Sequence, residues 1–361
     1  MPERRTIAVA TGSRAEFGLL EPVMRAVDGH PALTLRTLVA GAHLVRGTDA
    51  DVEAAGFAID ARVPMQQAGA SGRTADAEAA GRGIAGFAAA YRSLRPDVVV
   101  VLGDRIEAFA AAAAASIAGL RVAHLHGGDR AEGVADEAMR HAITKLAHLH
   151  LPATADSRRR ILRMGEHPEQ VRRVGSPAID GLKAVRPADD APRAIVLQHP
   201  IGAAAADERR RMAATLAATR SLRPRLIMAP NGDPGCEGVR AAIDDAGVDP
   251  VEHLPRSRFV ALLKGAAVIV GNSSAGLIEA AALRTPAVNV GPRQAGRERP
   301  RHIVDCDYGR ANVEAAVRRA LALDLKGLRH PYGPGRAGER VADLLATLDL
   351  DAIAVRKHNR Y

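Results

Sequence analysis

The chain has 361 residues, a formal net charge of +9 and an aromatic content of 2%, and this length predicts two domains of roughly 150 to 180 residues. The two cysteines do not suggest a disulfide framework, which fits a reducing compartment. The sequence shows no signal peptide and no apolar run long enough to span a membrane. We therefore expect a cytoplasmic protein without a membrane partner. The charge does not predict a nucleic-acid partner, because only five of the 50 basic residues are lysine and the arginines are scattered.

The first half alternates short apolar runs with longer helical stretches, which predicts a parallel sheet covered by helices on both faces. The expected strands are Thr6–Ala10, Thr34–Ala40, Asp97–Leu102, Arg121–His126, His148–Leu151 and Val171–Val174. The expected helices are Phe17–Asp28, Ala75–Leu94, Arg105–Ile117, Asp136–Ala147 and Ala155–Met164.

A stretch rich in Pro and Asp at 184–193 interrupts this alternation and predicts a linker between a first domain, 1–183, and a second, 194–337. In the second domain we expect strands at Ala194–Gln198, Leu226–Ala229, Val251–Leu254, Val268–Val270 and Ala287–Val290. The helices expected there are Ala203–Thr219, Ser257–Lys264 and Ser274–Leu283. Residues 338–361 predict a helical segment that packs back across the domains. The fold class is therefore α/β, with two Rossmann-like, doubly wound domains facing a central cleft.

The turn "TGSRAEFGLL" (11–20) joins the first strand to the first helix, where α/β proteins hold phosphates. It matches neither of the glycine-rich phosphate motifs. Its distinctive residue is Arg14, whose guanidinium suits a diphosphate. The turn therefore predicts a phosphate-bearing ligand bound by an arginine.

Polar residues also follow the later strands of the first half. Asp104 comes directly after the buried run Val98–Leu102, where it can either cap a helix or face a ligand site. In "HLHGGD" (124–129), His124 and His126 are expected on one side of a strand, with Asp129 nearby. This pattern fits either a metal site or two histidines that hydrogen-bond to loop backbone. We expect no metal, because no further pair of residues with the spacing of metal ligands follows in the sequence.

The segment "ADEAMRHAITKLAHLH" (135–150) begins a helix with two acids. Asp136 and Arg140 share a helix face, either as a solvated ion pair or with the arginine holding the carboxylate for proton transfer. His141 and His148 are expected to pack rather than react.

In the second half, His199 again stands at a strand end, in "IVLQHP" (195–200). In "GNSSAGLIEAA" (271–281), Ser273 and Ser274 offer hydroxyls and N–H groups to a phosphate, or serve as helix caps. Glu279 is placed to accept from sugar hydroxyls or lies on the surface. The loop "GPRQAGRERP" (291–300) adds several donors. Together these turns predict a nucleotide diphosphate-sugar held between two domains.

The ordered set of motifs resembles the UDP-N-acetylglucosamine 2-epimerase family, in particular its hydrolysing branch, nearly from end to end. The resemblance is carried by "TGSRAEFG" (11–18), "GDRIEAF" (103–109), "HLHGGD" (124–129), "DEAMRHAITKLAHLHLPAT" (136–154), "VGSPAID" (174–180), "LQHP" (197–200), "GNSSAGLIEA" (271–280), "VNVGPRQAGRER" (288–299) and "HPYGPGRAGERV" (330–341). It implies the two-domain GT-B glycosyltransferase-like fold, with the nucleotide mainly on the second domain.

The resemblance also implies residue roles. The catalytic positions are Asp104, Asp136, His126, Arg140 and His199, and the substrate-binding positions are Arg14, Asp129, Glu137, Ser273, Ser274, Glu279, Arg293, Gln294 and Arg297. His126 stands where many members carry a glutamate, which resembles the bacterial sialic- and legionaminic-acid type. This leaves the assignment of base and acid open among Asp104, Asp136, Asp129 and His126.

The implied reaction eliminates UDP to a bound glycal, then hydrates it with inversion at C2 to give free N-acetylmannosamine, or a 4-acetamido-6-deoxy analogue, and UDP. No cofactor is expected, which agrees with the missing G-x-G-x-x-G motif. The alternatives are a non-hydrolysing 2-epimerase, a GT-B glycosyltransferase and a non-catalytic nucleotide-sugar-binding protein. Relatives suggest a homodimer or homotetramer.

Overall fold

The structure is a computed structural model that describes residues 4–70, 72–130, 137–358 and 360. These residues divide into two compact units. The first is made of the described residues of 1–129, 136–180 and 332–361, and the second of those of 130–135 and 181–331. No helix among the described residues is long and apolar enough to cross a membrane. The domain boundaries expected from the sequence, with a linker at 184–193, remain a prediction.

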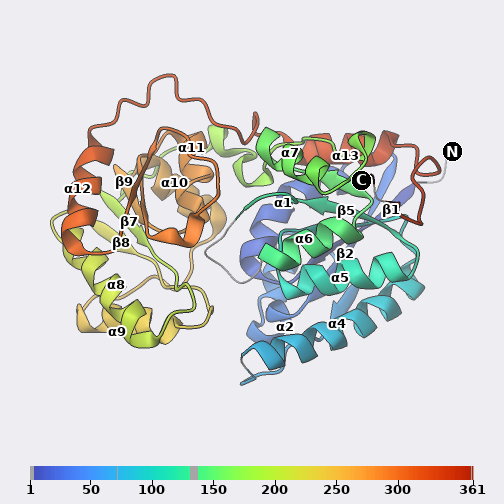
Figure 1. Ribbon diagram of the computed structural model, residues 1–361, viewed down its shortest axis with the longest axis horizontal. Helices are drawn as coiled ribbons and strands as arrows, with labels where there is room; N and C mark the ends of the chain where they lie inside the picture. Colours follow the sequence, from blue (N-terminus) through green and yellow to red (C-terminus); the bar gives the residue numbers. More distant parts are fainter. Residues whose placement is uncertain (1–3, 71, 131–136, 359, 361) are drawn as a thin grey trace. The chain divides into compact units, whose positions relative to one another are not determined.

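The described residues of the first unit form a six-stranded parallel sheet in the order β3-β2-β1-β4-β5-β6. Figure 1 labels β1, β2 and β5 of this sheet. Its strands are β1 (Arg5–Thr11), β2 (Leu33–Ala40), β3 (Ala61–Val63), β4 (Val98–Leu102), β5 (Arg121–Leu125) and β6 (Leu149–Leu151). The strand order reverses between β1 and β4. In doubly wound sheets ligands bind outside the carboxyl ends of the strands at such a reversal.

Helices cover both faces of this sheet because successive β-strand side chains point to opposite sides. Ile7 and Val9 of β1 pack with α1 and α13, whereas Ala8 and Ala10 pack with α4, α5 and α6. The helices are α1 (Arg14–Asp28), α2 (Ala42–Arg46), α3 (Asp49–Ala54), α4 (Arg73–Leu94), α5 (Ile106–Ile117), α6 (Glu137–Leu146), α7 (Ala155–Arg163) and α13 (Ala337–Thr347).

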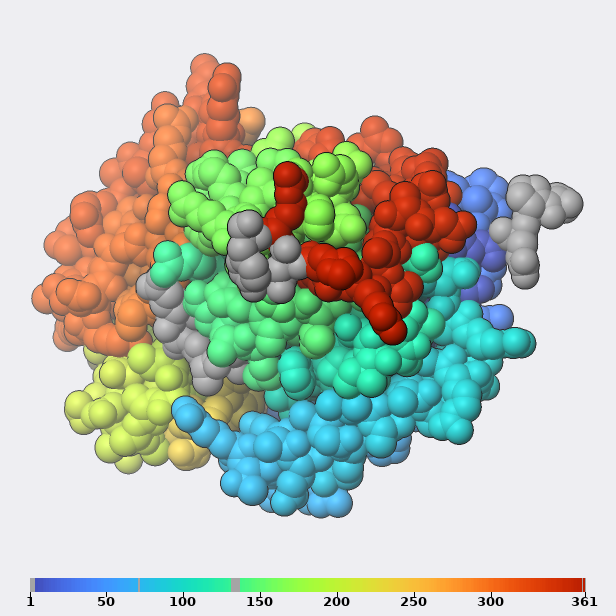
Figure 2. Space-filling model, turned by 45° about the vertical axis from the view of Figure 1, so that its right-hand side comes forward, coloured from blue at the N-terminus to red at the C-terminus, as the bar shows by residue number. Residues whose placement is uncertain are grey.

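The C-terminal part of the chain completes the first unit. Both carboxylate oxygens of Asp180 accept from the first backbone N–H groups of α13, at 2.9 Å from Ala337 and 2.7 Å from Gly338, and α13 packs on α1. After α13 the chain continues to Lys357, whose Nζ lies 2.7 Å from Glu166 Oε2. Figure 2 shows this last segment, in red, lying over the green part of the chain.

The described residues of the second unit form a five-stranded parallel sheet in the order β11-β10-β9-β7-β8, which reverses between β7 and β9. Its strands are β7 (Ala194–Leu197), β8 (Arg225–Ile227), β9 (Val268–Gly271), β10 (Ala287–Val290) and β11 (Ile303–Cys306). The helices α8 (Ala205–Ala218), α9 (Cys236–Asp245) and α12 (Arg310–Leu321) pack on one face, and α10 (Arg256–Gly265) and α11 (Glu279–Leu283) on the other.

The predicted class of two doubly wound α/β domains is confirmed, but some elements differ. The expected strands at Val171–Val174 and Val251–Leu254 are single bridging pairs, His150 with Val171 and Met228 with Val251. The expected helix Ser274–Leu283 is split into a 3-10 turn, Ser274–Gly276, and α11. The strands β3 and β11 were not predicted, because β3 has three residues and β11 is only partly buried.

Gly271 ends β9 where two strands approach closely. Its φ is +144°, and a Cβ there would lie 2.0 Å from Leu197 O on β7. We expect Gly271→Ala to lower the free energy of unfolding by about 3 kcal/mol or more, because the backbones must separate. Urea unfolding measures this. Gly81→Ala in α4, where a Cβ meets open space, is the control and should raise stability slightly. Equal stability of the two variants would contradict the prediction.

Candidate active site

Both strands at the reversal of the first sheet end in the polar turns that the sequence singles out. After β1, Ser13 caps α1, with its Oγ 3.4 Å from the backbone N of Glu16, and Glu16 Oε2 accepts from Gly12 N at 2.6 Å. Arg14 begins α1, and 36% of its side chain is exposed. Its Nε lies 3.1 Å from Asp51 Oδ2. The turn therefore presents Arg14 at a helix N-terminus, as expected.

Asp104 follows β4 and is paired with Arg140 of α6. The Arg140 side chain is buried, and its Nη1 also donates to the backbone oxygen of His126 at 3.2 Å. One guanidinium thus links the ends of β4 and β5 to α6 and holds the Asp104 carboxylate in a fixed orientation. The sequence predicted Asp136 as the partner of Arg140, but Asp136 lies outside the described residues.

The histidines of "HLHGGD" have different surroundings. His124 Nε2 lies 2.8 Å from Gly103 O, and Nδ1 lies 3.2 Å from Thr144 Oγ1. Burial lowers the pKa of His124 to about 3, so the ring is neutral at pH 7. His124 therefore fits the structural alternative, a histidine paired with loop backbone.

His126 leaves the strand, because β5 ends at Leu125 and His126 has a φ of +59°. The expectation that both histidines lie on one side of a strand is therefore wrong for His126. Its Nδ1 lies 2.8 Å from Asp129 Oδ2 and its Nε2 3.0 Å from Ser176 Oγ, while Asp129 Oδ1 accepts from Ser157 at 2.7 Å. A carboxylate only accepts, so Asp129 fixes a proton on Nδ1. Asp129 is buried and orients His126.

Glu137 is the first residue of α6, and its Oε1 lies 3.6 Å from His141 Nε2, one turn further along the helix. His148 is buried, with Nδ1 accepting from Val122 N at 3.1 Å and Nε2 at 3.0 Å from Val355 O. His148 thus packs as expected, whereas the His141 side chain is partly exposed and its packing remains a prediction.

The reversal of the second sheet brings His199 and the "GNSS" turn together. Asn272 joins them: its Oδ1 accepts from His199 N at 2.7 Å, and its Nδ2 donates to His199 O at 2.8 Å. Gln294, which is buried, donates from Nε2 to Asn272 O at 2.8 Å, and Arg293 Nη1 lies 3.5 Å from the same oxygen. Three separate motifs therefore meet at one point of this unit.

His199 is a neutral donor in this arrangement. Burial, helped by Arg293 and opposed by Asp233, lowers its pKa to about 3. The backbone N–H of Asn231 donates to His199 Nδ1 at 3.1 Å, which leaves the ring proton on Nε2. Among the described residues no group accepts a hydrogen bond from Nε2. The side chain therefore offers one N–H that no described residue uses.

The serine turn and Glu279 follow β9. Ser273 Oγ accepts from Ala275 N at 3.3 Å and caps the 3-10 turn, so the capping alternative holds for Ser273, while Ser274 is half-buried. Glu279 begins α11 and is only 7% exposed, with Oε1 3.5 Å from Arg256 Nη1, so it is not a surface residue. Arg297 N donates to Gln294 O at 3.3 Å in the loop after β10.

Sequence reasoning missed three residues that support this site. Asn231 and Asp233 stand in "PNGDPG" after β8, where Asn231 Nδ2 donates to Asp233 Oδ2 at 2.6 Å. Asp233 Oδ2 also lies 3.3 Å from Arg293 Nη2. Asn272 was part of a noted motif but had no role of its own. The turn-forming composition of "NGDPG" was the one available signal.

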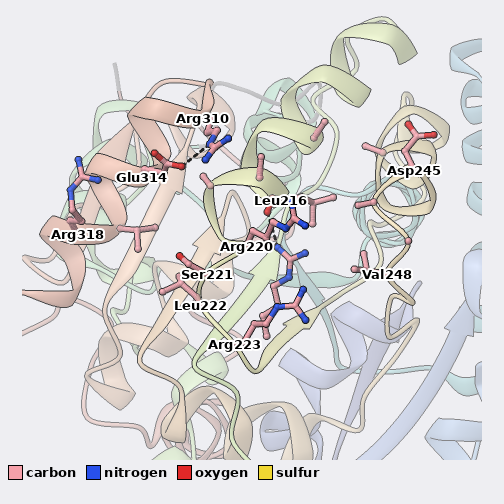
Figure 3. Close-up of a pocket in the computed structure, with 18 of the residues that line it drawn as sticks. Leu216, Arg220, Ser221, Leu222, Arg223, Asp245, Val248, Arg310, Glu314 and Arg318 are labelled. Atoms are coloured by element: carbon pink, nitrogen blue, oxygen red, sulfur yellow. Dashed lines mark hydrogen bonds and ion pairs between the residues drawn. The ribbon is translucent and has the colours of Figure 1, made fainter.

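A pocket of about 1080 Å³ lies elsewhere in the second unit (Figure 3). The helices α8, α9 and α12 line it, together with the loop between α8 and β8, and its wall includes Arg220, Arg223, Arg310 and Arg318. Arg310 Nε pairs with Glu314 Oε1 at 2.7 Å. The residues at the sheet reversal do not line this pocket, so we do not identify it as the reaction site.

Comparison with known proteins gives consistent matches. A family model described as UDP-N-acetylglucosamine 2-epimerase matches residues 25–346. A UDP-N,N'-diacetylbacillosamine 2-epimerase (hydrolyzing) from Legionella pneumophila is 33% identical, covering 99% of this chain and 100% of its own. A UDP-N-acetylglucosamine 2-epimerase from Neisseria meningitidis is 30% identical, covering 88% of each. The crystal structure of a Methanocaldococcus jannaschii UDP-GlcNAc 2-epimerase in complex with UDP-GlcNAc and UDP matches with a TM-score of 0.80 and 18% identity, covering 94% of this chain and 99% of that one.

Proposed function

The chain belongs to the UDP-N-acetylglucosamine 2-epimerase family, and from this we propose that it hydrolyses a UDP-linked 2-acetamido sugar while inverting C2. The products are UDP and the free 2-epimer: N-acetylmannosamine, or a 4-acetamido-6-deoxy analogue of the kind used for sialic or legionaminic acids. The full-length Legionella relative, named as a hydrolysing enzyme of a diacetylated sugar, supports hydrolysis and favours the analogue.

The observation that carries the proposal is the chemistry at the two sheet reversals. At the first, an arginine at a helix N-terminus and an arginine-held carboxylate, Asp104, follow adjacent strands. At the second, the neutral N–H donor of His199 and the Ser273–Ser274 turn follow adjacent strands. Cations and N–H donors suit a diphosphate, and a carboxylate suits proton transfer from carbon.

In the proposed binding mode, the second unit holds the nucleotide. The hydroxyl and backbone N–H of Ser274 donate to a phosphate, and Glu279 accepts from ribose hydroxyls. Arg293, Gln294 and Arg297 order the loop beside them. Arg14 contributes its guanidinium to the diphosphate, which is a bidentate match.

The reaction starts at C1 because the C2 proton has no neighbouring carbonyl and is barely acidic. The C1–O bond breaks early, UDP leaves with the electron pair, and Arg14 and the His199 N–H stabilise the developing negative charge. Asp104 takes the C2 proton from the oxocarbenium-like centre to give a glycal. Water then adds at C1 and gives up one proton to bulk water, while C2 receives a proton from a protonated carboxyl group on the opposite face. That second proton carrier is Asp136 in our proposal, since Asp129 is engaged by His126 and Ser157.

Proton NMR of the purified protein in heavy water tests this reaction. The substrates are UDP-N-acetylglucosamine and UDP-N,N'-diacetylbacillosamine, each incubated separately. We expect one of them to give a free sugar epimerised and deuterated at C2, together with UDP. A mixture of UDP-linked epimers would select the non-hydrolysing reaction instead. Binding of UDP without turnover of either sugar would contradict the proposal.

A further inference from the structure

Two buried carboxyl groups, Glu16 and Glu107, lie against the turn that carries Arg14, and the proposed reaction does not use them. Glu16, on the first turn of α1, is 5% exposed, and Glu107, on the first turn of α5, is 1% exposed. Both contact Gly12: Glu16 Oε2 accepts from its backbone N at 2.6 Å, and a Cβ on Gly12 would lie 2.9 Å from the carboxyl carbon of Glu107. One glycine therefore separates two carboxyls.

The two carboxyls have unequal partners. Glu107 Oε1 accepts from Gln66 Nε2 at 2.7 Å, and Glu107 Oε2 lies 3.4 Å from Arg105 Nε. Glu16 has only the Gly12 N–H on one oxygen, and its other oxygen, Oε1, is buried without a hydrogen-bond partner in the part of the chain that the structure describes. An ionised carboxylate would leave that oxygen unpaired beside a second negative charge, which is costly in a buried site.

We infer that Glu16 and Glu107 hold one proton between them, on Glu16, and that this neutral-and-charged pair positions the Gly12–Arg14 turn for the diphosphate. That this turn binds a diphosphate rests on the proposed function. That the two glutamates share one proton does not depend on it. Neutral Glu16 still accepts from Gly12 N–H, and it avoids placing a second negative charge beside Glu107 in a buried site. Both glutamates act through Arg14, so they are positioning residues.

The electrostatics of the neighbourhood agree with this assignment. Burial first, and then the charge of Glu107, raise the pKa of Glu16 to about 8, with Asp104 adding to the rise. The Gly12 N–H and the charge of Arg105 oppose it. Two further groups near Glu107 are His43 on α2, whose pKa burial lowers, and Asp76 on α4, whose pKa burial raises.

The sign of the effect on stability follows from linkage. The unfolded chain releases the Glu16 proton near the ordinary value of 4.5, whereas the folded chain keeps it to about 8. Stability therefore falls as pH rises through this window and stops falling above it. Above about pH 8 the second negative charge also disturbs the turn beneath Arg14.

The decisive variant is Glu16→Gln, because an amide resembles the neutral acid in shape and can both accept from Gly12 and donate. We expect wild-type affinity for UDP and kcat/KM to fall above about pH 8, and both to stay level in E16Q. At about pH 7 the two proteins should agree within about threefold. The control is Glu21→Gln on the same helix, where Glu21 pairs with Arg25, and it should keep the wild-type profile.

Two readouts do not depend on catalysis. Wild-type protein labelled with ¹³C at the glutamate carboxyl should show one carboxyl that titrates near pH 8, and this signal should be absent from E16Q. In urea unfolding, the free energy of unfolding of wild type should fall relative to that of E16Q as pH rises from about 5 to about 8. If every glutamate is ionised by about pH 6, or if E16Q keeps an alkaline fall in UDP affinity, the inference is overturned. Absence of turnover in wild type would refute the proposed function and leave these readouts intact.

Discussion

Asp104→Asn is expected to lower kcat by about 10²- to 10⁴-fold, because an amide cannot take up the C2 proton. The amide oxygen can still accept from Arg140, so the site should keep its shape. Affinity for UDP, measured by calorimetry, should change less than about threefold, since Asp104 does not contact the nucleotide in the proposed mode. Steady-state kinetics with the UDP-sugar that turns over in the NMR experiment measures kcat.

A matched control separates this effect from a general loss of charge. Asp343→Asn removes an exposed carboxylate from α13 and should leave kcat unchanged. Arg140→Lys tests the positioning of Asp104, because a lysine keeps the charge but loses the fork that reaches both Asp104 and His126 O. We expect an intermediate loss of kcat in Arg140→Lys. A wild-type kcat for Asp104→Asn would remove Asp104 from the mechanism.

Glu166→Gln is expected to lower the free energy of unfolding by about 3 kcal/mol, the largest effect on stability that we expect from removing one charge. The Glu166 carboxylate is buried and accepts from Lys145 Nζ at 2.7 Å, His150 Nε2 at 3.0 Å and Lys357 Nζ at 2.7 Å. A neutral amide leaves two lysines without their counter-charge. Urea unfolding at neutral pH measures the loss, and Glu169→Gln, at an exposed position nearby, should show none.

The same variant has a defined pH dependence. Burial raises the pKa of Glu166, but the hydrogen bonds from His150, Lys145 and Lys357 outweigh burial and bring it to about 2, below the ordinary value of 4.5. The stabilisation is therefore present above about pH 4.5 and is lost as pH falls towards 2. Wild type and Glu166→Gln should converge in stability at acidic pH. If the difference in free energy of unfolding between wild type and Glu166→Gln stays constant down to pH 2, the charge of Glu166 is not the source of that difference.

Lys357 also connects the end of the chain to α6 of the first unit. Its Nζ donates to the backbone oxygens of Thr144 at 3.0 Å and Lys145 at 2.9 Å, at the C-terminal end of α6. A cation at a helix C-terminus is favourable for the helix dipole. The helix that carries Arg140 is thus held at its far end by a residue more than 200 positions later.

The sequence by itself determined the two doubly wound sheets and the position of Arg14, Asp104, His199 and Ser274 at strand ends. Apolar runs such as Val98–Leu102 predict buried parallel strands, and a strand followed by a polar turn and a helix is a local pattern. These features depend on residues within one turn or strand of each other. No knowledge of the rest of the chain is needed to find them.

Only the tertiary structure decided which side chains meet. Arg140 pairs with Asp104, Glu16 meets Glu107 across Gly12, and Asn272 binds the backbone of His199. Each contact joins segments from different strand ends, and their proximity depends on the strand order and on where it reverses. Local periodicity does not encode that order, because the same strand and helix patterns fit many sheet arrangements.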